Sequence, residues 1–99
     1  MKFVKRITLS PLGHIISEND IEILDVTGTA LTLYHTHVGM LKMHESCVIH
    51  LRVGSVIDNI DWVHLDKDAH AVIITHSEGC NIPYKHLPDG VCIDHIQDE

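Results

Sequence analysis

Apolar and polar residues alternate along most of the chain, which is typical of β-strands that bury one face. In the stretch 2–9, for example, Phe3, Ile7 and Leu9 fall on one parity, while Arg6 and Thr8 fall on the other. The same pattern predicts further strands over residues 21–26, 30–37, 47–53, 56–65, 69–76 and 91–96, with a short apolar piece at 14–16. Valine, isoleucine and threonine together number 28 against 3 alanines, and this composition favours strands over helices.

One stretch departs from the alternation. Met40, Met43 and Cys47 are spaced i, i+3 and i+7, which predicts a short helical turn near 39–46. Turn signals such as Leu87-Pro88-Asp89-Gly90 recur every eight to twelve residues, and the chain shows neither an internal repeat nor a linker. The expected fold is therefore all-β: a small antiparallel β-barrel or sandwich of six to eight short strands, forming a single domain over 1–99.

Composition narrows the class of protein. The chain has 99 residues, 44% of them hydrophobic, so one folded domain is expected rather than a disordered tail. Fourteen acidic against 7 basic residues give a formal charge of −7, which disfavours nucleic acid as a partner. No apolar run approaches the roughly 18 residues that cross a bilayer, and the first residues lack the apolar segment of a signal peptide. We therefore expect no membrane partner. The three cysteines, Cys47, Cys80 and Cys92, are odd in number, so we expect a reduced, cytoplasmic protein.

The ten histidines are the main candidates for chemistry. On a regular strand, His35 and His37 would share one face about 6–7 Å apart, close enough to bind one divalent metal ion such as zinc. Glu45 and His76 could complete that site. The run from Gly28 through this pair and Glu45 to Gly54 is similar to a cupin pattern, with stretched gaps. The alternative is that histidines this frequent pair by chance on a solvated face.

A second short stretch resembles a known family. Residues 25–31, beginning with Asp25 and Thr27, are similar to the second motif of PilZ domains. The family's arginine pair appears only as Lys2-x-x-x-Arg6, and Ala30 stands where the family has glycine. The resemblance implies a regulatory barrel that binds a cyclic dinucleotide, with Arg6, Asp25 and Thr27 as ligand-binding residues.

No residue is favoured as a catalyst, because the cysteines carry no nucleophile signature and no serine lies in a G-x-S-x-G context. We therefore expect a non-enzymatic binding or regulatory β domain that acts through self-association or through a protein or small-ligand partner. Apolar residues on both parities, as at Val48-Ile49 and 72–74, predict a homo-oligomer, with a dimer favoured. A histidine-rich metal-binding domain and a PilZ-like effector remain the alternatives.

Overall fold

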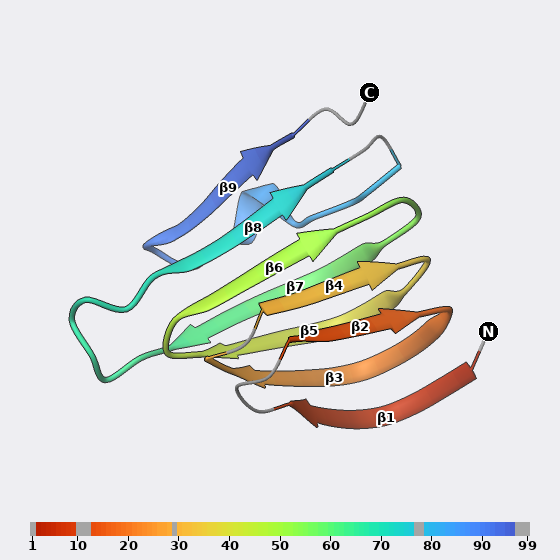
Figure 1. The fold of residues 1–99 in the computed structure, drawn as a ribbon, viewed down its shortest axis with the longest axis horizontal. Helices are drawn as coiled ribbons and strands as arrows, with labels where there is room; N and C mark the ends of the chain where they lie inside the picture. Colours follow the sequence, from red (N-terminus) through yellow and green to blue (C-terminus); the bar gives the residue numbers. More distant parts are fainter. Residues whose placement is uncertain (1, 10–12, 29, 77–78, 97–99) are drawn as a thin grey trace.

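The computed structural model describes residues 2–9, 13–28, 30–76 and 79–96. They form a β-solenoid of about five turns in which every paired strand runs parallel to its neighbours (Figure 1). Its elements are β1 (Lys2–Leu9), β2 (His14–Ser17), β3 (Asn19–Thr27), β4 (Ala30–Tyr34), β5 (His37–His44), β6 (Cys47–Leu51), β7 (Val56–Val63), β8 (Ala71–Thr75), the 3₁₀-helix η1 (Tyr84–His86) and β9 (Val91–His95).

Each of the first four turns of the solenoid contributes one strand to each of two sheets, and the last turn adds only β9. One sheet has the order β1-β3-β5-β7 and the other the order β2-β4-β6-β8-β9, and the strands of the two sheets run in opposite directions (Figure 1). The first turns stack at a constant sequence offset, which places Lys2 beside Asn19 and Asp20 beside His37. Later turns are longer, since Cys47 lies beside Ala71.

Apart from β5, the strand positions predicted from the alternation were close, but the predicted antiparallel barrel or sandwich was wrong. Alternation identifies which side chains point inward, and it does not identify the neighbouring strand. Here each strand crosses to the opposite sheet before the chain returns, so all pairings within a sheet are parallel.

The helical turn predicted near 39–46 was also wrong, because this stretch lies in β5. Val38, Leu41 and Met43 are fully buried, so two successive residues point outward before alternation resumes. Met40, Met43 and Cys47, whose spacing suggested the helical turn, therefore do not share a face: Met40 points outward from β5, Met43 points inward, and Cys47 begins β6. Gly39 occupies one of the outward positions, where a Cβ atom would lie 2.8 Å from the backbone oxygen of Glu22.

The same inward spacing recurs in all four strands of this sheet, so the sequence does contain a repeat. In register, the inner rows are Val4–Ile21–Val38–Ile57, Ile7–Leu24–Leu41–Ile60 and Leu9–Val26–Met43–Trp62. The opposite sheet adds the rows His14–Leu31–Ile49–Ile73–Ile93 and Ile16–Leu33–Leu51–Thr75–His95. The core lies between these rows, and its central turns are fully buried.

The corners of the solenoid also repeat. Glu18 and His35 adopt positive φ angles of 57° and 46°, and Glu45 does so at the opposite corner with 60°. Backbone hydrogen bonds join the corner of one turn to the next, as from the His35 N–H to the Val53 oxygen at 2.9 Å. A positive φ at His35 ends β4, so the predicted strand 30–37 is split between the two sheets.

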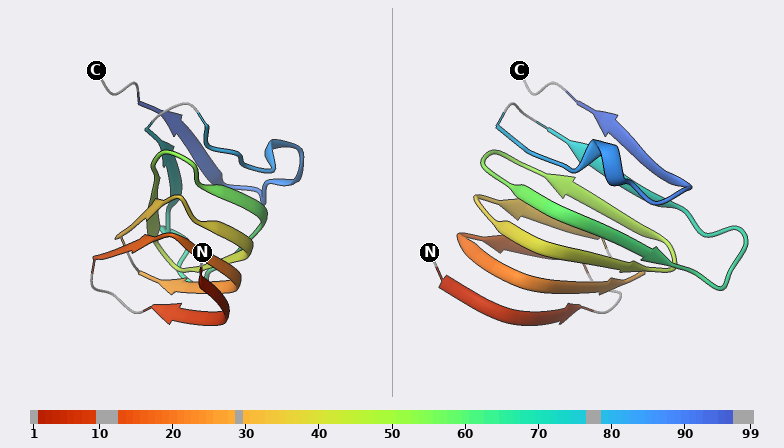
Figure 2. Two further views of the ribbon diagram at one scale, coloured as in Figure 1. Left: turned by 90° about the vertical axis from the view of Figure 1, so that its right-hand side faces the viewer. Right: turned by 180° about the vertical axis from the view of Figure 1, so that it is seen from behind.

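The two ends of the solenoid differ (Figure 2). At the C-terminal end, the segment 81–90 with η1 lies beside β7, the edge strand of its sheet: Asn81 bridges to Val56, and Gly90 lies next to Trp62. Its Ile82 is buried and its Leu87 packs against the core. At the N-terminal end, β1 and β2 are the first strands of their sheets. In the ranges described, no helix has the length and apolar character needed to cross a membrane.

Candidate functional site

The four predicted metal ligands lie apart in the folded chain. His35 turns outward at a corner above Gly54, whereas His37 begins β5 in the other sheet. The expectation that these two share a strand face is therefore wrong. Glu45 accepts hydrogen bonds from the backbone N–H groups of Leu65 and Asp66. His76 pairs with another histidine, and nowhere in the described part of the chain do three or more His, Cys, Asp or Glu residues gather as a metal site.

His37 instead lies between two carboxylates on the outer face of its sheet. Its Nδ1 is 3.0 Å from Asp20 Oδ1, and its Nε2 is 2.6 Å from Asp58 Oδ2. The hydrogen bond to Asp58 is the largest cause that raises the pKa of His37, and Asp20 adds to it. Protonated, the ring donates to both carboxylates and ties together β3, β5 and β7.

A second histidine pair lies on the outer face of the opposite sheet. His50 Nδ1 is 2.6 Å from His76 Nε2, and the ring centroids are 4.9 Å apart. The guanidinium of Arg52, two residues along the chain from His50, lies over the ring of Tyr34 at 5.8 Å from its centroid. Burial lowers the pKa of His50, and the nearby charges of His76 and Arg52 lower it further.

These opposite shifts predict a maximum of stability near pH 6.5. For His37, whose folded pKa is raised, the stabilisation is complete below the unfolded value of about 6.5 and is lost as the pH rises through the folded value. For His50, whose folded pKa is lowered, the unfolded chain takes up protons first, so stability falls as the pH drops below about 6.5.

Urea unfolding from pH 5 to 8.5 measures both effects. We expect His37→Gln to reduce the fall in the free energy of unfolding above pH 6.5 by at most about 1 kcal/mol, because solvent screens the contacts of His37 with the two carboxylates. His50→Gln should reduce the fall in the free energy of unfolding below pH 6.5. His70→Gln serves as the control, because His70 is exposed. An unchanged alkaline slope in His37→Gln would contradict the role of the two carboxylates.

The residues expected from the PilZ resemblance are partly brought together. Arg6 Nη2 is 2.5 Å from Asp25 Oδ2, and the Asp25 carboxylate is buried. His44 Nε2 lies 3.5 Å from the other oxygen of Asp25. Thr27 is exposed at the end of β3, and Thr29, within the quoted motif, lies outside the described residues. The guanidinium of Arg6 is thus already engaged in joining β1 to β3, and the barrel that the resemblance implies is not the observed fold.

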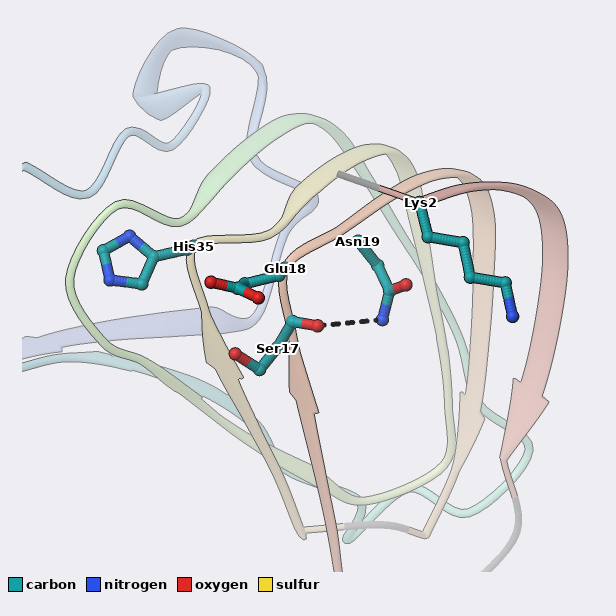
Figure 3. Close-up of a pocket in the computed structure, with 5 residues that line it drawn as sticks. All are labelled: Lys2, Ser17, Glu18, Asn19 and His35. Carbon is teal, nitrogen blue, oxygen red and sulfur yellow. Dashed lines mark hydrogen bonds between the residues drawn. The ribbon is translucent and has the colours of Figure 1, made fainter.

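The N-terminal end of the solenoid carries a hollow of about 660 Å³ at its corner. Figure 3 shows the residues that line it: Lys2, Ser17, Glu18, Asn19 and His35. The backbone N–H of Lys2 donates to the Glu18 oxygen at 3.3 Å, so a basic and an acidic side chain lie at the same corner. Strand alternation alone did not single out this corner, because its position depends on the stacking of the turns.

The core is incompletely covered at this same end. Val4, Ile7 and Leu9 of β1 are only partly buried, whereas their counterparts in β3 are fully buried. Two large apolar side chains are exposed beside them, Phe3 at 66% and Ile15 at 74%. The N-terminal end, defined here as the outer edges of β1 and β2 with these side chains, therefore combines strand edges with apolar surface.

Comparison with known proteins adds no relative. Neither a protein-family model, a curated protein nor a solved structure matches this chain.

Proposed function

We propose that this protein is a non-enzymatic binding module that acts by associating with a second copy of itself through its N-terminal end. The supporting observation is the incompletely covered core of the first turn, beside the outer edges of β1 and β2. Solenoids need their terminal turns covered, and an uncovered strand edge is a template for pairing with another chain. The three free cysteines support a reducing compartment such as the cytoplasm.

The difference between the two ends supports a closed dimer over a head-to-tail filament. In a filament, β1 of one copy would meet the segment 81–90 of the next copy, which offers it no regular strand. Two N-terminal ends, in contrast, present four strand edges to one another. Such an isologous contact closes after two copies.

Charge selects one of two head-to-head arrangements. If β1 paired antiparallel with β1 of the second copy about its midpoint, Lys5 would lie opposite Arg6, and like charges directly opposite are unfavourable. A twofold axis along the strands places β1 beside β2 of the second copy instead. These strands run in opposite directions (Figure 1), so they form an antiparallel pair.

The second arrangement also brings opposite charges together. Lys2 and Glu18 lie at one corner of the solenoid, and a twofold axis along the strands keeps that corner at the same side in both copies. Each Lys2 then lies near Glu18 of the second copy, while Phe3 and Ile15 are covered by the contact. Both features favour β1 pairing with β2 of the second copy.

Sedimentation equilibrium of the full chain tests this proposal. We expect a dimer at tens of micromolar, and Ile15→Lys should weaken it at least about tenfold, as expected for a central apolar contact. Leu65→Lys is the matched control, since Leu65 is 93% exposed and lies far along the chain from the proposed contact. A monomeric parent, or an Ile15→Lys variant that dimerises like the parent, would refute the proposal.

A charge exchange tests the arrangement. Lys2→Glu and Glu18→Lys should each weaken the dimer about three- to fivefold, and the double variant should restore it. If β1 paired with β1 instead, Lys5→Glu would strengthen the dimer by placing opposite charges together, and the double exchange would restore nothing.

A further inference from the structure

We infer that His50 and His76 form a binding site for one divalent transition-metal ion that prefers imidazole, such as nickel, copper or zinc. This site is separate from the N-terminal end. Of the four metal ligands predicted from the sequence, it includes only His76. It rests on the facing ring nitrogens, 2.6 Å apart, of His50 in β6 and of His76, which directly follows β8.

The backbone holds the two rings in place. His50 lies within β6, and His76 directly follows β8, where its N–H donates to the Leu51 oxygen at 2.9 Å. Because β6 and β8 are paired over five residues, the two side chains are fixed neighbours on a rigid surface. Ligands on rigid elements lose little freedom when an ion binds.

To admit an ion, the two nitrogens must separate from 2.6 Å, and each ring must rotate so that its nitrogen lone pair points at the ion instead of at the other ring. Metal–imidazole bonds of about 2.0–2.1 Å place two nitrogens roughly 2.9 Å apart at a right angle and roughly 3.3 Å apart in a tetrahedron. The facing nitrogens are now joined by one hydrogen bond, with one ring donating and the other accepting. An ion replaces the shared hydrogen, which moves to the far nitrogen of the donating ring, so no proton need leave the protein at neutral pH.

Neighbouring charges act in opposite directions on the affinity of this site for a cation. Asp94 lies on β9 in register with Ile74, one diagonal step from His76, and its carboxylate favours a cation there. Arg52 opposes the cation, since its positive charge acts on the His50 ring. Two protein ligands leave the remaining positions of the ion to water.

Calorimetric titration of the full, tag-free chain with Ni²⁺ at pH 7.5 tests the site. We expect one ion per chain and a rise in Tm of about 5 °C at a free Ni²⁺ concentration of about five times Kd. His50→Gln and His76→Gln should each lower the affinity at least about tenfold, a loss that even indirect ligand contacts can produce. His70→Gln and His37→Gln should bind as the parent does.

Arg52→Gln distinguishes a cation site from an anion site on the same side chains. Removing the guanidinium should tighten Ni²⁺ binding, whereas binding of inorganic phosphate that depends on His50 and weakens in Arg52→Gln would instead indicate an anion site. That outcome, or Ni²⁺ binding that is unchanged in both His50→Gln and His76→Gln, overturns the inference.

Discussion

Leu41→Ala should destabilise the protein by about 2–5 kcal/mol. Leu41 is fully buried in the third turn, in the inner row Ile7–Leu24–Leu41–Ile60, with a neighbouring turn on each side. Truncation removes apolar contacts and leaves a cavity between two sheets whose backbones are fixed by pairing. A domain of this size has a total stability of only about 5–15 kcal/mol, so the variant should lose a large share of it.

Urea unfolding followed by circular dichroism measures this loss. Leu41→Met keeps most of the volume and should cost less than about 1.5 kcal/mol. Leu65→Ala, at a site 93% exposed, should change stability by less than about 0.5 kcal/mol. If Leu41→Ala were as stable as Leu65→Ala, the inner row would not be a packed core.

The position of the strands could be predicted because burial on one face imposes alternation on each strand separately. Their order could not, since a parallel solenoid and an antiparallel barrel demand similar inward and outward patterns. The repeat was missed because it conserves side-chain class and not identity. Val4, Ile21 and Val38 are evenly spaced along the chain, and Ile7, Leu24 and Leu41 follow at the same spacing. Comparing apolar positions at that offset would have indicated stacked turns.

The candidate sites depended on that same missing register. Asp20 and His37 are separated by this same offset, so they become neighbours only once the turns are stacked. The His50–His76 pair crosses one of the longer turns, which no fixed period would reveal. The sequence thus identified single histidines as candidates for chemistry. Which residue lies next to each histidine depends on the loop lengths. The predicted His35–His37 pair was wrong because His35 itself adopts a positive φ at the corner between β4 and β5, which turns its ring away from that of His37.

Trp62 lies, partly buried, at the last position of the inner row Leu9–Val26–Met43–Trp62. Its Nε1 donates to the Glu45 oxygen at 2.8 Å, and its ring stacks on His64 with centroids 4.0 Å apart. Trp62→Ala should therefore cost about 3 kcal/mol, the lower end of the range for a buried tryptophan. Trp62→Phe should lose about 1 kcal/mol with the hydrogen bond.

A substitution at Gly90 tests whether the Trp62 ring packs against the segment 81–90 at the C-terminal end of the solenoid. A Cβ atom at Gly90 would lie 2.7 Å from Cζ3 of Trp62, and its φ of 87° is unfavourable for other residues. Gly90→Ala should therefore destabilise the parent through both the contact and the backbone strain. In a Trp62→Ala background only the strain remains, so the same substitution should cost less, with a coupling of about 0.5–3 kcal/mol in the double-mutant cycle. Additive costs would mean that the segment 81–90 does not pack on Trp62.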